Sequence, residues 1–141
     1  PLNRSWSLDA LRYERPAQST VPAWCLGLLR FQLGGVYFFG GVAKLDTDWL
    51  RGQPMRMWLA EKQSLPVVGP WMTEEWMVQC FVWGGLLIDL LAVPGLLWRR
   101  TRPLMFGVLI VFHLLNSQLF TIGFFPWLMT AASTLFFAPD W

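Results

Sequence analysis

One lysine stands at the end of the first long apolar run of the chain, within the segment GGVAKLD at positions 40–46. The 23 residues before it, 21–43, carry a single formal charge. About 20 apolar residues are enough to cross a bilayer as a helix, so we expect Lys44 where a membrane helix meets the interface. Partial desolvation at that place disfavours an ammonium group, and a neutral amine can act as a base. The alternative is an anchor whose stem lies in lipid while its ammonium group reaches water.

Three more ionisable residues, Arg30, Asp89 and His113, occupy similar depths in three different apolar segments. Each lies nine or ten residues from the same side of its segment. At about 1.5 Å per helical residue, all three are expected roughly 13–15 Å deep. Because a charge in hydrocarbon is costly unless it is paired, we predict a structural ion pair between Arg30 and Asp89, with His113 nearby. We expect this pair to hold helices together rather than to react, since ion-pair networks also occur where nothing is catalysed.

The segment around His113 carries a group of polar side chains, His113, Asn116, Ser117 and Gln118. Residues three and four positions apart lie on one helix face, which places His113, Asn116 and Ser117 together. Gln118 points elsewhere unless the helix end unwinds. A single amide in a membrane helix commonly bonds to a neighbouring helix. Four polar residues within six positions instead predict the wall of a polar cavity that opens toward the side of Lys44.

The composition of the chain is that of a membrane protein. It has 55% hydrophobic and 14% charged residues with a mean hydropathy of +0.40, whereas an average soluble domain has about 25% charged residues. The net charge is +2 and no basic stripe is present, which argues against a nucleic-acid partner. One histidine and two separated cysteines cannot build a zinc site by themselves, so we expect no metal. The chain starts and stops abruptly, and we interpret it as a piece of a longer protein.

Four apolar segments predict an all-α, multi-pass transmembrane helix bundle, with spans at 21–43, 77–98, 104–120 and 122–137. We expect all four to belong to one transmembrane domain. Gly123 and Pro126 separate the last two spans, because they break a stretch too long for one helix. The mixed segment 45–76 contains several tryptophans, as membrane interfaces do, and 54–61 is expected to form a short interfacial helix.

The distribution of arginines predicts the orientation of these spans. Three arginines within 99–102 and three more before residue 20 fall on one side, which the excess of positive charge assigns to the cytoplasm. Lys44 and the 45–76 segment are therefore expected on the non-cytoplasmic side. The membrane would be the cytoplasmic membrane in a bacterium and the endoplasmic reticulum in a eukaryote.

Three motifs together resemble a known family. They are VYFFGGVAKLDTDW at 36–49, preceded by LRFQ at 29–32, then FHLLNSQLFTIGFFPW at 112–127, and LFFAPDW at 135–141. These segments closely resemble the membrane domain, of the HTTM type, of the vitamin K-dependent gamma-carboxylase family. The resemblance runs through nearly the whole chain from about residue 24.

The resemblance implies a carboxylase of the carbon–carbon lyase type that lies in the lipid bilayer. Members of the family oxidise vitamin K hydroquinone, or here another reduced quinone, with O2 to the epoxide. The strong base so formed removes a γ-proton from glutamate in a protein or peptide substrate, and the carbanion adds CO2. Family members also have further membrane helices before this segment and a large extramembrane domain after it. We therefore expect this fragment alone to be inactive.

The resemblance also implies roles for individual residues. The catalytic lysine of the family falls on Lys44, which would deprotonate the hydroquinone, and Ala43 stands where the typical motif has a second lysine. A catalytic role is likewise implied for His113. Binding of the ring oxygens or of the carbanion is implied for Asn116, Ser117 and Gln118.

Two other functions remain open from the sequence. The spacing of Arg30, Gly35, Phe38, Gly41 and Lys44 is also similar to that of DoxX-type four-helix membrane modules, which carry out no carboxylation. The NSQLF and GFFPW motifs argue against that class. The other alternative is a structural membrane bundle in which every polar group bonds one helix to another.

Overall fold

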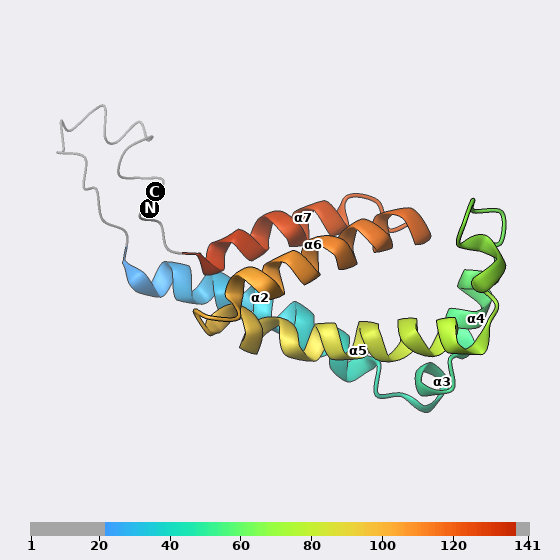
Figure 1. The fold of residues 1–141 in the computed structure, drawn as a ribbon. Coiled ribbons are helices and arrows are strands. Elements are labelled where there is room, and N and C mark those ends of the chain that lie inside the picture. The colour runs from blue at the N-terminus through green and yellow to red at the C-terminus, as the bar shows by residue number, and fades with distance from the viewer. Residues whose placement is uncertain (1–21, 138–141) are drawn as a thin grey trace.

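The structure, a computed structural model, describes residues 22–137. Within that range every regular element is a helix, which confirms the all-α fold class (Figure 1). The arginines that precede residue 20 and the end of the third motif, 138–141, lie outside the described residues. Their contribution to orientation and family resemblance therefore stays a prediction.

Three of the helices are long and apolar enough to cross a membrane. They are α2 (Ala23–Ala43), α5 (Glu75–Leu97) and α6 (Arg102–Leu119). Their bounds agree with the first three predicted spans to within two residues. The helix α6 begins with proline at one of its first two positions, where the missing N–H has no helical partner to lose.

The fourth predicted span, 122–137, differs from the structure. Helix α7 (Phe125–Ser133) has only nine residues and tightens into a short 3-10 helix, Thr134–Phe136. At about 1.5 Å per residue, α7 is roughly 14 Å long, about half of the hydrocarbon thickness. Both helical pieces lie inside the predicted segment, and the first of them starts later than expected because the chain turns at Gly123, in a left-handed conformation with φ of 59°. The role of this segment as a fourth span stays a prediction.

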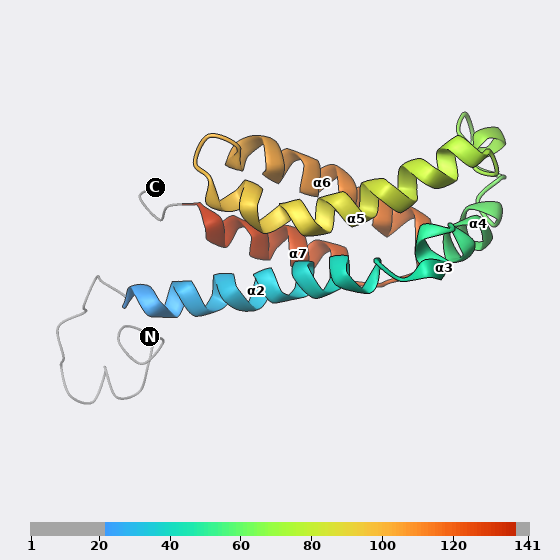
Figure 2. The same cartoon turned by 90° about the horizontal axis from the view of Figure 1, so that it is seen from below.

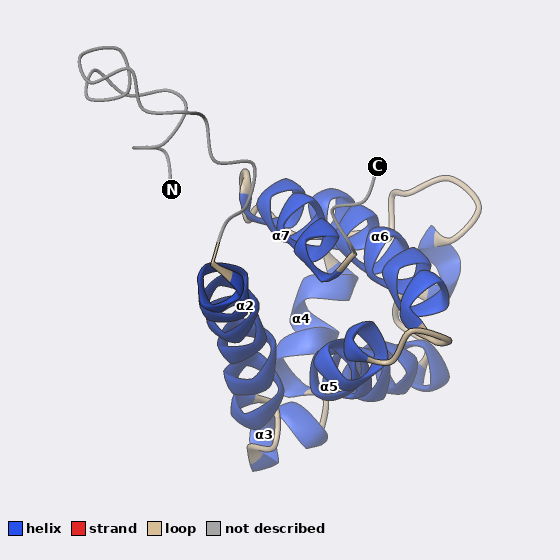
Figure 3. Cartoon of the chain, turned by 90° about the vertical axis from the view of Figure 1, so that its left-hand side faces the viewer, coloured by secondary structure: helices blue, strands red, loops and turns tan. Residues whose placement is uncertain are grey.

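Helices α2, α5, α6 and α7 form a bundle in which α5 packs against both α2 and α6. Helix α7 packs against α6 and closes back onto α2, as the view along the bundle shows (Figure 3). Helices α2 and α5 pack against one another, and Figure 2 shows both running along the length of the molecule. A glycine permits this approach: a Cβ atom at Gly41 would lie 2.6 Å from a side-chain carbon of Leu90.

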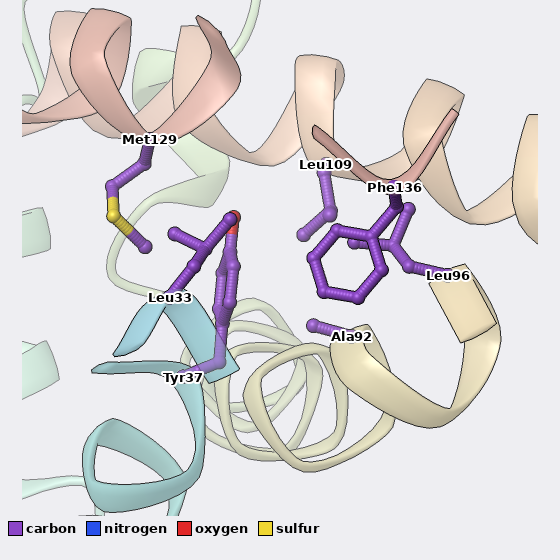
Figure 4. Packing of buried hydrophobic residues seen from close by; sticks show 7 residues of the cluster. All are labelled: Leu33, Tyr37, Ala92, Leu96, Leu109, Met129 and Phe136. Carbon is purple, nitrogen blue, oxygen red and sulfur yellow. The ribbon is translucent and has the colours of Figure 1, made fainter. Parts of the chain in front are cut away.

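The main hydrophobic core lies where these helices meet (Figure 4). It consists of Leu33, Tyr37, Ala92, Leu96, Leu109, Met129 and Phe136. Each of the four helices contributes to it, and so does the 3-10 helix after α7. The short final helix is therefore held by side-chain packing against the bundle rather than by its own length.

A second core attaches the segment between α2 and α5 to one end of the bundle. Two short helices, α3 (Thr47–Leu50) and α4 (Gln53–Ala60), and a 3-10 turn, Gly69–Trp71, make up the regular part of this segment. The buried residues of this second core come from the segment and from α5 and α6: Met55, Leu59, Met72, Val78, Val82 and Leu119. The helix predicted at 54–61 is thus confirmed, within a residue, as α4.

Candidate functional site

Lys44 caps the C-terminus of α2 and turns its side chain toward α5. Its ammonium Nζ donates to Asp89 Oδ2 at 2.5 Å and to the carbonyl oxygen of Gly40 at 3.2 Å. It also lies 5.1 Å from the centre of the Trp49 ring, in the range of a cation–π contact. The side chain of Lys44 is 20% exposed and that of Asp89 only 9%. The two charges therefore meet at the wall of the bundle, with the carboxylate on its inner side.

This arrangement corrects the predicted pair between Arg30 and Asp89. Arg30 Nε donates instead to the carbonyl oxygen of Leu135 at 2.8 Å, and its guanidinium lies 5.7 Å from the centre of the Phe136 ring. Counting depth by Cα position missed the length of a lysine side chain, which leans back toward the N-terminus of its helix and reaches the level of Gly40. Arg30 thereby satisfies a carbonyl group of the 3-10 helix Thr134–Phe136.

Small residues make room for the Lys44–Asp89 pair. A Cβ atom on Gly40 would lie 3.2 Å from Asp89 Oδ2, and one on Gly85 would lie 3.7 Å from the Cε atom of Lys44. The glycine on α2 thus brings the carboxylate close to the helix backbone, and the glycine on α5 leaves space for the lysine stem.

Lys44 lines a cavity of about 1270 Å³. Its charged and amide lining residues are Lys44, Glu61, Lys62 and Asn116. Most of the remaining wall is apolar: α5 contributes lining residues as far as Ile88, and the wall continues along α6 as far as Pro103, at the opposite end of that helix. Lining residues on α6 extend to Leu119, which corresponds to roughly 24 Å of helix. The site is a long, largely apolar groove whose wall carries the Lys44 amine and the Asn116 amide.

Aromatic side chains surround the polar part of this cavity. Trp49 and Trp58 meet edge to face with centroids 6.3 Å apart, and Trp58 meets Phe120 in the same way at 5.4 Å. All three line the cavity. Trp49 is fixed by a hydrogen bond from Nε1 to the carbonyl oxygen of Val82, at 3.2 Å. Helix α3 thereby holds the flat Trp49 ring beside the amine, and Trp58 on α4 continues the aromatic wall.

The sequence predicts that the four polar residues of α6 form the wall of one polar cavity. In the structure they face different surroundings. Asn116 lines the cavity with Lys44, whereas His113 is 3% exposed and lies in the core. Ser117 Oγ donates to the carbonyl oxygen of Leu114 in its own helix, and Gln118 is exposed. Helix α6 packs against α5 and α7 on different sides, so residues three positions apart diverge enough to face different neighbours. The roles implied for His113, Ser117 and Gln118 stay predictions.

Sequence reasoning missed the hydrogen-bond partner of His113, which is Tyr37, and the further contact of Tyr37 with Ser133. The Tyr37 hydroxyl lies 2.8 Å from His113 Nε2 and 3.2 Å from Ser133 Oγ, which itself donates to the carbonyl oxygen of Met129. A signal was present in the spacing, since Arg30, Tyr37 and Lys44 recur every seven residues on one face of α2. That face carries the polar contacts of α2 at three levels of the bundle.

The sequence of the chain matches the model of a known protein family. The model of the HTTM domain matches residues 1–141. The chain belongs to the HTTM domain family. This domain is associated with vitamin K-dependent carboxylase, and together with three long apolar helices it marks the chain as an integral membrane protein. No solved structure matches the chain.

Proposed function

We propose that this HTTM domain binds a reduced quinone and that Lys44 removes a proton from the quinol hydroxyl group. In the full-length protein this step would start oxidation of the hydroquinone by O2, coupled to carboxylation of protein-bound glutamate. The observation that carries the proposal is that the Lys44 amine and Asn116 both line one largely apolar cavity.

The shape of the groove supports a ligand with a polar ring and a long apolar tail. The charged and amide groups of the cavity can meet ring oxygens, and the Asn116 amide can donate to one of them. Trp49 and Trp58 offer flat surfaces for a ring. The apolar walls toward Pro103 suit a hydrocarbon tail, and a membrane supplies such ligands from its own lipid phase.

The bound quinol supplies the chemistry: its oxidation by O2 to the epoxide generates the strong base that takes the γ-proton of glutamate. The residues of this chain have simpler tasks. Lys44 accepts the hydroxyl proton at Nζ and then balances the oxyanion as an ammonium group. The Trp49 ring covers one side of the amine, 5.1 Å from Nζ, and the lower polarity there strengthens the electrostatic contact of the amine with an anion.

Replacement of Lys44 tests the proposal in the full-length protein. Lys44→Ala should abolish hydroquinone-dependent epoxide formation and CO2 incorporation together, since both follow from one deprotonation. Lys44→Arg should fail as well, because a guanidinium does not lose its proton near neutral pH. Arg51→Ala, which removes an exposed cation nearby and outside the cavity wall, is the matched control and should keep both activities.

The alternative of a structural bundle has one observation in its favour, since the Lys44–Asp89 pair joins α2 to α5. In that case Lys44→Ala would lower thermal stability, and the wild-type protein itself would form no epoxide from hydroquinone. An active, folded Lys44→Ala protein would overturn the catalytic proposal.

A further inference from the structure

We infer that Asp89 governs the reactivity of Lys44: it holds the lysine as an ammonium group at the cavity wall and receives a proton from it when a substrate hydroxyl group arrives. This inference rests on the proposed function for its substrate. In this scheme Asp89 is a positioning residue, because it acts through Lys44 and does not line the cavity.

The contacts of the two side chains define the arrangement. Two of the three protons of the Lys44 ammonium group are donated, one to Asp89 Oδ2 and one to the carbonyl oxygen of Gly40. Lys44 lines the cavity, whereas Asp89 lies behind it with 9% of its side chain exposed. A proton that leaves the substrate must therefore pass through the amine to reach the carboxylate.

Other titratable groups near the cavity are less well placed to take this proton. Glu61, Lys62 and Cys80 line the same cavity but have no hydrogen bond to Lys44. Tyr37 and His113, in the neighbouring part of the core, are hydrogen-bonded to one another. Among the residues that the structure describes, Asp89 is the only carboxylate in a salt bridge with Lys44.

The pair solves a problem that an ammonium group poses for base catalysis. A lysine that is already protonated cannot accept the hydroxyl proton. If one proton moves from Nζ of Lys44 to Oδ2 of Asp89, the amine is free to accept the substrate proton. One substrate O–H bond and one N–H bond break, and one N–H bond and one O–H bond form. The products are a neutral Asp89 carboxyl group, a Lys44 ammonium group and a substrate oxyanion beside it.

The pH dependence of turnover tests this scheme in the full-length protein. With the carboxylate present, we expect a rate that is nearly constant from about pH 7 to pH 9, well above the range in which carboxyl groups titrate. Asp89→Asn should reduce the rate at pH 7 at least about tenfold and make it rise with pH, because the amine must then lose its proton to solvent. Asp89→Glu keeps a carboxylate and should keep the flat profile at a lower rate.

Chemical labelling of the amine gives a readout that needs no turnover. The sequence has one other lysine, Lys62, which serves as an internal reference when peptides are quantified by mass spectrometry after treatment with an amine-reactive reagent. Asp89→Asn should raise labelling of Lys44 relative to Lys62 at least about threefold at neutral pH, since loss of the counter-charge favours the neutral amine. Glu75→Gln breaks the exposed ion pair with Arg56 and should change neither labelling nor the pH profile.

Two results would overturn the inference. One is an Asp89→Asn protein whose pH profile has the shape of the wild type and whose Lys44 labelling is unchanged. The other is an Asp89→Glu protein that shows the same alkaline dependence as Asp89→Asn. If the full-length wild type forms no epoxide from hydroquinone, the proposed function fails, and the labelling ratio still decides whether Asp89 controls Lys44.

Discussion

Tyr37 and His113 join α2 to α6 through a 2.8 Å contact between the hydroxyl oxygen and Nε2, deep in the bundle and away from the cavity wall. The Tyr37 hydroxyl also reaches Ser133 on α7, so one phenol connects three helices. Both partners are nearly inaccessible, with 2% of Tyr37 and 3% of His113 exposed. The hydrogen bonds of the Tyr37 hydroxyl should stabilise the bundle, because a buried polar group that loses its partner keeps the full cost of desolvation.

Removal of the Tyr37 hydroxyl should therefore weaken the bundle. We expect Tyr37→Phe to lower stability by about 1–3 kcal/mol, since Nε2 of His113 is left without its partner. Thermal unfolding in detergent measures the loss. Phe38→Leu, on an exposed position of the same helix, is the control and should melt close to the wild type. Equal melting of Tyr37→Phe and the control would show that the contact adds nothing.

The catalytic role predicted for His113 can be separated from its place in the core. His113→Ala should spare hydroquinone binding and reduce turnover, because the histidine does not line the cavity yet supports the face of α2 that ends at Lys44. Measurement of KM and kcat for epoxide formation distinguishes the two effects. A large rise in KM with normal kcat would place His113 in contact with the ligand instead.

Loss of the Asp89 carboxylate should also destabilise the bundle. Asp89→Asn removes the counter-charge of Lys44 at the wall between α2 and α5, and a buried charge left unpaired costs more than a neutral group. We expect a larger drop in the detergent melting temperature than for Glu75→Gln, whose ion pair with Arg56 is exposed to solvent. Similar melting temperatures of the two variants would mean that the Lys44–Asp89 pair does not stabilise the bundle.

The groove between α5 and α6 makes a prediction about tail length. A Cβ atom on Gly107 meets no atom within 4 Å, and this residue lines the cavity. Gly107→Leu should therefore fit without strain and fill the groove, raising KM about tenfold for a long-tailed quinol while sparing a short-tailed analogue. Gly27→Leu is the matched control, because Gly27 has equal space around it and does not line the cavity. Equal effects on both analogues would remove the groove as the tail site.

The predicted orientation can be tested with single cysteines in the 45–76 segment and in the turn between α5 and α6. A cysteine at Lys62 should react with an impermeant thiol reagent in intact cells, and one at Arg100 should not, because the arginine-rich turn is assigned to the cytoplasm. Cys80 is exposed in the structure, so it is first replaced by serine to clear the background. The reverse labelling pattern would place Lys44 on the cytoplasmic side.

Local sequence patterns were enough to predict the long helices and α4. The lengths of the apolar segments and the charged residues that flank them predict α2, α5 and α6. A helix that spans hydrocarbon must satisfy its own backbone hydrogen bonds and present apolar side chains. The same reasoning predicted the break at Gly123 and a helical segment after it, but not the short extent of α7, which packs against the bundle. The HTTM family was also visible in the sequence, because its motifs are long and ordered.

The partners of the polar residues were decided by the tertiary structure. The sequence by itself determined that Lys44 ends a membrane-length helix and that Asp89 lies within another. Depth counted along single helices then favoured Arg30 as the partner of Asp89. The fold places Gly40 close to the Asp89 carboxylate at the contact of α2 with α5 and lets the lysine side chain reach back to that carboxylate. Helix rotation and side-chain reach fix which charges meet, and neither is encoded in the spacing of residues along one chain segment.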